Sequence, residues 1–199
     1  MASIQELKDL DPQSYPVYFF DANIWIALIK YNNLNKKEKG FDEYINLFEA
    51  IVQLNNISDP KIEKKIKCKP RIAITSMLLS EIINAYLRRV AMPAFLNGSS
   101  GDFKKDYREN IYSDYDKQLK IIISDILSYS FTFVYVDDAF SSIDHNSFLN
   151  SLNRNLDFND LYYLNLMELK SIAIVTHDKD FNTHNVSILT SNYRLLKSK

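Results

Sequence analysis

Short runs of apolar residues alternate with longer segments of helical periodicity along this chain. The segments that read as strands are Val17–Phe20, Ile72–Ile74, Phe131–Val136, Ile172–Val175 and Ser187–Leu189. Most of them are apolar on consecutive positions, which is typical of strands buried on both faces. Strands that are separated by helices pair as parallel neighbours, with the helices packed on the two faces of the sheet. The sequence therefore predicts an α/β fold, a three-layer α/β/α sandwich with a central, mostly parallel sheet.

The segments between these strands carry apolar residues at helical spacing. The predicted helices are Asn23–Tyr31, Phe41–Leu54, Ser76–Val90, Tyr107–Ser128, Ser141–Leu152 and Asp160–Leu169. Between them lie a polar, lysine-rich connection, Ile57–Pro70, and a loop, Asn97–Asp102, which holds two of the three glycines. With 199 residues, the chain is expected to form a single domain over 1–199, with helical or loop insertions around 35–70 and 92–130.

Composition excludes several functional classes. None of the three glycines directly follows a strand-like run, which excludes the glycine-rich phosphate loops of P-loop NTPases and dinucleotide-binding proteins. Cys68 is the single cysteine, so no disulfide framework or thiolate zinc cluster is expected. The N-terminus has no apolar segment of the signal-peptide type, and no run approaches the roughly 20 apolar residues of a membrane span. We therefore expect a cytoplasmic protein without a membrane partner.

Four acids stand where parallel strands would end. Asp21 closes the first strand, Glu81 lies in the helix after the second, Asp160 opens a helix, and Asp178 follows the strand Ile172–Val175. Taken singly, each has an ordinary structural explanation as a helix cap or an ion-pair partner. Because ligand sites form beyond the carboxyl ends of parallel strands, all four are expected to converge. Crowded carboxylates repel one another unless neutralised, and hard oxygen ligands suit Mg²⁺ or Mn²⁺.

Three segments together resemble the PIN-domain ribonucleases, including the VapC-type toxins. They are FDANIWI at the first strand, SMLLSEI after the second, and DLYYLNLMELKSIAIVTHDKDF near the C-terminus. The third is the most specific, because it keeps the order of Asp, amphipathic helix, apolar strand, Thr and two further acids. By this resemblance the acidic cluster is Asp21, Glu81, Asp160 and Asp178, accompanied by Asn23, Thr176 and Asp180. Lys170–Ser171 stands where the family often has a glycine.

The resemblance implies a metal-dependent endoribonuclease that hydrolyses RNA phosphodiester bonds. Asp21 and Asp160 would be direct ligands of Mg²⁺ or Mn²⁺, and Glu81 and Asp178 would complete the site through waters or orient the nucleophile. Asn23 and Thr176 would hold these ligands by hydrogen bonds. The resemblance further implies an RNA substrate, an antitoxin protein as partner of a toxin-like member, and a homodimer.

Other interpretations stay open at this point. A non-catalytic PIN-like module that binds RNA or protein would share the fold. Metal-free acid–base catalysis by His145, His177 or His184 has no readable spacing, and a phosphatase of the Asp-x-Asp type is disfavoured because Asn23 occupies the second acid position. The net charge is −1, so any nucleic-acid binding must come from local basic patches. The stretch KIEKKIKCKP at 61–70 is either a solvated face or a phosphate-binding groove.

Overall fold

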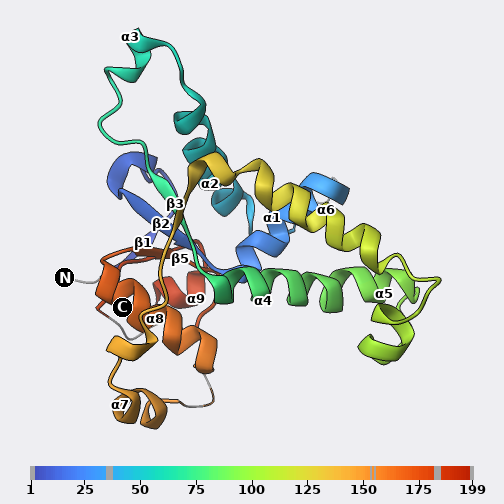
Figure 1. The fold of residues 1–199 in the computed structure, drawn as a ribbon. Helices are drawn as coiled ribbons and strands as arrows, with labels where there is room; N and C mark the ends of the chain where they lie inside the picture. Colours follow the sequence, from blue (N-terminus) through green and yellow to red (C-terminus); the bar gives the residue numbers. More distant parts are fainter. Residues whose placement is uncertain (1–2, 35–37, 153, 155, 182–184, 198–199) are drawn as a thin grey trace.

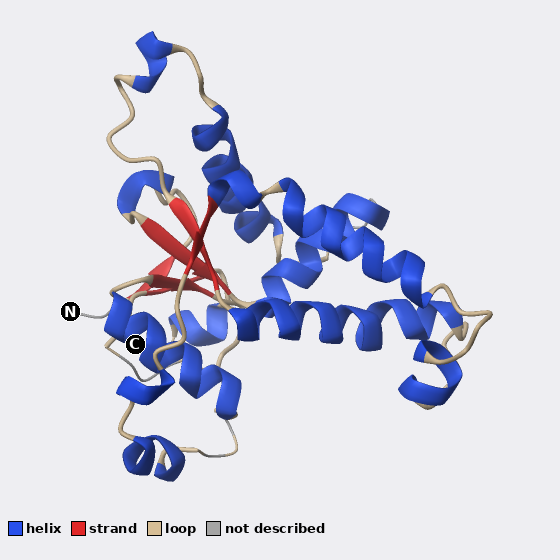
Figure 2. Cartoon of the chain, in the orientation of Figure 1, coloured by secondary structure: helices blue, strands red, loops and turns tan. Residues whose placement is uncertain are grey.

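A computed structural model describes residues 3–34, 38–152, 154, 156–181 and 185–197. Within these residues a single sheet of parallel strands runs through the molecule, in the order β1-β6-β5-β2-β3-β4 (Figure 2). The strands are β1 (Ile4–Glu6), β2 (Val17–Phe20), β3 (Arg71–Ile74), β4 (Phe133–Tyr135), β5 (Ala173–Val175) and β6 (Ile188–Thr190). The parallel sheet is confirmed. Strand β1 is not predicted from the sequence, because IQE lacks an apolar run. The strand lies at the edge of the sheet and pairs with β6.

Helices connect the strands and carry most of the remaining chain. They are α1 (Ala22–Leu34), α2 (Asp42–Asn56), α3 (Pro60–Glu63), α4 (Ser76–Tyr86), α5 (Met92–Phe95), α6 (Tyr115–Ser128), α7 (His145–Asn150), α8 (Phe158–Lys170) and α9 (Tyr193–Leu196). Two π-helical segments, η2 (Leu87–Ala91) and η3 (Phe103–Arg108), and three short 3₁₀ turns, η1 (Pro12–Ser14), η4 (Ser130–Thr132) and η5 (Phe140–Ser142), complete the elements. In the described part of the chain, no helix has both the length and the hydropathy needed to cross a bilayer.

The side chains of β2 show how the layers are built. Phe19 packs its ring against Tyr163 of α8, with 4.8 Å between ring centroids, whereas Phe20 packs against Phe48 of α2 at 5.2 Å. Because successive residues of a strand point to opposite faces, α8 covers one face of the sheet and α2 the other (Figure 1). All four rings are buried, so both interfaces belong to the core. The fold is a three-layer α/β/α sandwich, as the sequence predicts.

Several predicted elements are shorter in the structure than their apolar patterns suggest. The helix predicted over 107–128 begins only at Tyr115, because Asn110 accepts a hydrogen bond from the Tyr112 amide and closes a turn ahead of it. The helix predicted over 141–152 covers only His145–Asn150, since Asp144 caps its first turn. The helix predicted over 76–90 ends at Tyr86 and continues as η2. The strand predicted over 131–136 is reduced to β4.

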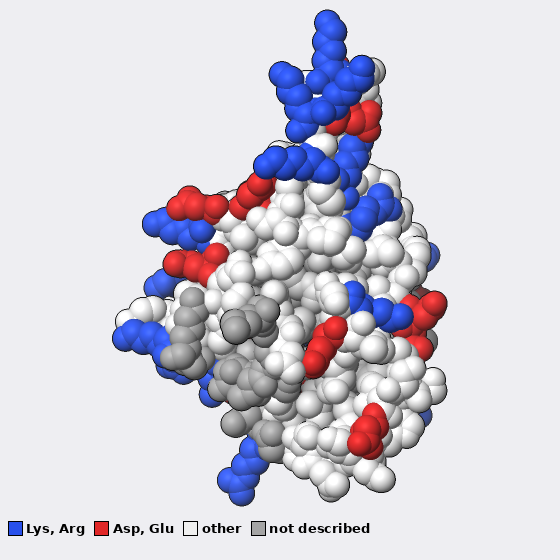
Figure 3. All heavy atoms as spheres, turned by 90° about the vertical axis from the view of Figure 1, so that its left-hand side faces the viewer, with Lys and Arg blue, Asp and Glu red and all other residues white. Residues whose placement is uncertain are grey.

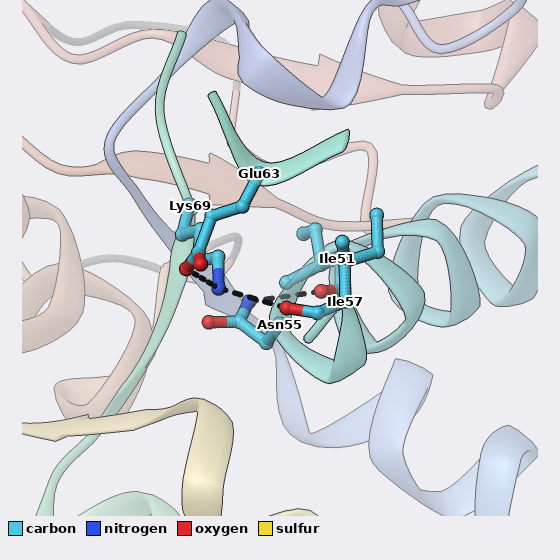
Figure 4. A network of polar contacts seen from close by, with 5 residues as sticks. All are labelled: Ile51, Asn55, Ile57, Glu63 and Lys69. Carbon is cyan, nitrogen blue, oxygen red and sulfur yellow. Dashed lines mark hydrogen bonds and ion pairs between the residues drawn. The ribbon is translucent and has the colours of Figure 1, made fainter. Parts of the chain in front are cut away.

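Residues 57–70 form an arm that stands away from the sheet and bears α3 near its tip (Figure 1). Lys69 Nζ fixes its base by donating to the Ile57 carbonyl at 3.1 Å and to Glu63 at 2.5 Å (Figure 4). Asn55 Nδ2 adds hydrogen bonds to the carbonyls of Ile51 and Pro70. The arm carries five lysines, and Lys side chains gather at the top of the molecule in Figure 3. We call residues 57–70 the basic arm.

Candidate functional site

The side of the sheet on which successive strands are added switches between β2 and β5. From β2 the chain proceeds to β3 and β4 on one side, while β5, β6 and β1 lie on the other. A crevice opens beyond the carboxyl ends of the strands at such a switch point. Asp21 directly follows β2 and Thr176 directly follows β5, and the Asp21 amide donates to the Val175 carbonyl at 3.0 Å. The first predicted site residue therefore lies at the position where the topology places a ligand site.

Asp21 is a buried acid held by two predicted neighbours. Its side chain and backbone together are only 4% exposed. Thr176 Oγ1 donates to Asp21 Oδ2 at 2.9 Å, and Asn23 Nδ2 approaches the same oxygen at 3.5 Å. Thr176 Oγ1 also accepts a hydrogen bond from the Asp178 amide at 3.0 Å. One threonine hydroxyl thus joins the acid after β2 to the acid after β5.

The pKa values show that the acids share one electrostatic environment. The pKa of Asp21 is raised to about 6, first by burial and then by the charges of Glu81 and Asp178, against the lowering effect of the hydrogen bond from Thr176. The pKa of Asp160 rises to about 7, first through burial and then through the charges of Asp157, Asp21 and Asp178. Carboxylates raise one another's pKa only when they lie near each other. Asp21 therefore lies within range of the charges of Glu81, Asp178 and Asp160.

Asp160 stands in the first turn of α8, a position where an acid can serve either a ligand site or the helix N-terminus. Asp157 is the N-cap of this helix and accepts the Asp160 amide at 3.0 Å. Because Asp157 accepts that amide, the Asp160 carboxylate is not required to cap the helix.

Glu81 is positioned by neutral donors. Tyr163 donates its hydroxyl proton to Glu81 Oε2 at 2.9 Å, and Asn159 Nδ2 donates to the same oxygen at 3.3 Å. An ordinary ion pair does not account for Glu81, because among the described residues it forms none with the nearby Arg88 or Arg89. The charge of Glu81 therefore remains available to the site.

The acid at position 180 plays a different part. The Asp180 amide donates to Asp178 Oδ1 at 3.0 Å, so its contact with the cluster is through the backbone. This hydrogen bond and the Thr176 hydroxyl together hold the turn that carries Asp178. Lys170–Ser171, which stands where the resemblance would place a glycine, lies before β5. Ser171 takes the left-handed conformation there, with φ 55°, at the end of α8.

Tyr163 and Asn159 are site residues that the sequence reasoning missed. Tyr163 follows Asp160 by three positions, so the two lie on the same side of α8. That spacing was a usable signal, but the apolar surroundings of Tyr163 made it look like core. It is indeed buried against Phe19, and its hydroxyl alone reaches the acids.

Replacing Tyr163 by phenylalanine is expected to lower the free energy of unfolding by about 1–2 kcal/mol, because a partly buried carboxylate loses a hydrogen-bond donor while the ring packing stays. Urea denaturation of wild type and Tyr163→Phe measures the difference. Tyr112→Phe is the matched control, since Tyr112 is 85% exposed and should leave stability unchanged. Equal losses in both variants would show that the Glu81 contact contributes nothing.

The donor set fits a hard divalent cation in its chemistry. It consists of carboxylate and hydroxyl oxygens, and burial together with neighbouring carboxylate charges raises the pKa values of Asp21 and Asp160. Over the described ranges, no three Asp, Glu, His or Cys side chains stand at the spacing of metal ligands. The Asp21 carboxylate accepts a hydrogen bond from Thr176, and the Glu81 carboxylate accepts hydrogen bonds from Tyr163 and Asn159. A cation would have to draw these side chains together.

The remaining sequence candidates lie outside this cluster. His177 bonds through Nδ1 to the Tyr44 hydroxyl and His145 through Nε2 to the Phe140 carbonyl, so each ring has its own partner; His184 is outside the described residues. The basic arm enters β3 at its amino end, whereas the acids follow the carboxyl ends of the strands. In a parallel sheet these ends are opposite, so the lysine run does not line a groove that contains the acids.

No protein-family model matches the sequence, and a search of curated proteins gave no significant match. Among solved structures, the chain is similar to a chain of VapBC2 from Rickettsia felis bound to a DNA fragment from their promoter. The two are 17% identical with a TM-score of 0.48, and the alignment covers 87% of this chain and 96% of that chain. A similarity of this degree leaves the function to be argued from the residues of the site.

Proposed function

We propose that the protein is a divalent-metal-dependent endoribonuclease that hydrolyses RNA phosphodiester bonds with the cluster around Asp21. The observation that carries this proposal is the gathering of carboxylates around the buried Asp21 at the switch point of the sheet, where burial and neighbouring charges raise the pKa values of Asp21 and Asp160. Holding several acids together costs stability, and proteins retain such arrangements mainly at functional sites. A non-catalytic binding module would have no need of them, so the cluster favours catalysis.

Each acid has a distinct task in this proposal. Asp21 and Asp160 would hold Mg²⁺ or Mn²⁺, because both carry raised pKa values and neither carboxylate is paired with a cationic side chain within the described structure. When bound, such a cation lowers the pKa of a coordinated water and offsets charge on the phosphate. Glu81, oriented by Tyr163 and Asn159, and Asp178, held by the Thr176 turn, would orient the attacking water.

Thr176 and Asn23 act on Asp21. Both contact Asp21 Oδ2. Thr176 is fully buried, so this oxygen is held in one orientation. Hydrogen bonds of this kind fix the direction of a metal ligand, and their loss typically costs about 10- to 100-fold in metal affinity or activity.

The direct test is cleavage of single-stranded RNA by purified protein. Wild type with millimolar Mg²⁺ or Mn²⁺ should produce defined fragments, and EDTA should stop the reaction until metal is added in excess. The reason is that the carboxylates cannot approach a phosphate without a neutralising charge. If wild type binds RNA in EDTA and does not cleave it with either metal, the binding-module interpretation replaces this proposal. The antitoxin partner and the homodimer stay predictions from the resemblance.

A further inference from the structure

Two cavities adjoin the acidic cluster. The first, of about 440 Å³, is lined by residues that include Asn23, Phe41, Arg89, His177, Asp178 and Asn192. The second, also of about 440 Å³, is lined by residues that include Ser80, Glu81, Arg88, Arg89, Asp157 and Asn159. We call them the aromatic cavity and the polar cavity. Each contains an acid of the proposed site, so a ligand that occupied both would pass over the cluster.

Arg89 lines both cavities, and within the described residues no other residue lines the two. It lies in η2, a π-helical turn that continues α4, and it is exposed. Widened turns of this kind occur often at functional sites. The neighbouring Arg88 is held over the ring of Phe103, with 4.1 Å from its guanidinium carbon to the ring centroid. In the described structure Arg89 forms no ion pair, so its charge is available to a ligand.

The aromatic cavity has a fixed wall. The rings of Phe41 and His177 are 4.8 Å apart and inclined by 33°. The Tyr44 hydroxyl holds His177 Nδ1 at 3.1 Å, and Asn192 Nδ2 donates to the His177 carbonyl at 2.6 Å. Lys30 is neutralised by Glu38 at 2.7 Å, so that among the described lining residues Arg89 and the exposed Lys179 are the cationic groups without an ion pair. Its volume lies within the roughly 300–1,000 Å³ of small-molecule sites.

Taken together, these features suit a nucleotide strand. We propose that one RNA strand crosses the acids from the polar to the aromatic cavity, that Arg89 binds the phosphate at the crossing, and that an unpaired base enters the aromatic cavity against Phe41 and His177. This inference rests on the proposed function, because it takes the phosphodiester as substrate. Bases can enter a pocket beside aromatic rings only when they are free of a duplex. The substrate class is therefore single-stranded or looped RNA.

Binding without catalysis tests the role of Arg89. The double variant Asp21→Asn, Asp160→Asn serves as background, since it lacks two repelling charges and two proposed ligands. A short fluorescent single-stranded RNA is titrated in EDTA at several salt concentrations. Adding Arg89→Ala should weaken binding about tenfold and reduce the salt slope by about 0.7, the loss of one phosphate contact on a single strand. Arg108→Ala, a change at another exposed arginine, should alter neither quantity.

The base-binding part is tested by comparing RNA with a ligand that lacks bases. Phe41→Leu should weaken binding of the RNA about threefold to tenfold, and should have no effect on an oligomer of the same length made of abasic ribose phosphate. His177→Gln is the second variant, so that a folding defect in Phe41→Leu does not decide the result. A duplex of the same sequence should bind at least tenfold more weakly than the single strand.

The outcomes separate this inference from the proposed function. If wild type cleaves RNA while Arg89→Ala retains an unchanged kcat/KM, or if Arg89→Ala binds RNA as tightly as Arg108→Ala does, the inference is overturned and the ribonuclease proposal stands. If Arg89→Ala loses binding as expected but wild type cleaves nothing in Mg²⁺ or Mn²⁺, the strand path is supported and the catalytic proposal fails. Equal binding of duplex and single strand overturns the unpaired base.

Discussion

Alanine at Asp160 or at Asp21 is expected to abolish RNA cleavage, with a loss of at least about a thousandfold in kcat/KM. Each side chain would supply an oxygen ligand to the cation, and the loss of such a ligand should remove about 4 kcal/mol or more of transition-state stabilisation. Since 1.36 kcal/mol corresponds to a factor of ten in rate, the thousandfold estimate follows. The measurement is the initial rate of RNA cleavage in Mg²⁺ for wild type and each variant, purified in parallel.

Asp180→Ala is the matched control for this experiment. Asp180 lies in the turn that carries Asp178, but its contact with the cluster is through the backbone amide, which alanine retains. Its activity should fall by less than about tenfold. All variants should keep a cooperative thermal transition, which excludes unfolding as the cause of lost activity. If Asp21→Ala and Asp160→Ala cleave as fast as wild type, the cleavage comes from a contaminating nuclease and the acids are structural.

The second large effect is on stability and its dependence on pH. An aspartate has a pKa of about 4 in the unfolded chain, and Asp21 has a pKa of about 6 in the folded protein. Below pH 4 the carboxyl is protonated in both states and adds no cost. As the pH rises from 4 to 6, the unfolded state ionises first, so the folded state loses about 3 kcal/mol by pH 7. Asp160, whose pKa is also raised, acts in the same direction.

Asp21→Asn should therefore stabilise the metal-free protein at pH 8 by about 2–3 kcal/mol and leave it nearly unchanged at pH 4. Asparagine keeps an oxygen that can accept the hydrogen bond from Thr176. Urea denaturation in EDTA across this pH range measures the effect. Asp116→Asn, at an exposed acid of α6, is the control and should show no such trend.

Adding Mg²⁺ at pH 8 should reverse the order of the two proteins. A cation that binds only the folded state stabilises wild type in proportion to the logarithm of its concentration, and the variant should lack most of this response. The difference between wild type and Asp21→Asn would contradict the prediction if it stayed the same at every pH, or if both responded equally to metal.

Much of the site could be predicted because its main residues follow strand ends. Asp21 and Thr176 each come directly after an apolar run, and parallel strands bring such positions to one edge of the sheet. The two are 155 positions apart in the chain, yet they are joined by a hydrogen bond of 2.9 Å. The basic arm was ambiguous in sequence, because a lysine run looks the same whether it is solvated or lines a groove. Its attachment to the amino end of β3 places it at the opposite end of the strands from the acids.

The sequence by itself determined the parallel α/β architecture and the acids that gather at its edge, since strand and helix periodicity and strand-end position are local properties of the chain. Only the tertiary structure decided which partners those acids have. Tyr163 and Asn159 reach Glu81 from about eighty positions away, and Arg89 joins two cavities whose walls come from several elements. Such contacts depend on strand order and helix packing. The local sequence indicates whether a side chain is buried, but it does not indicate which group the polar end of that side chain contacts.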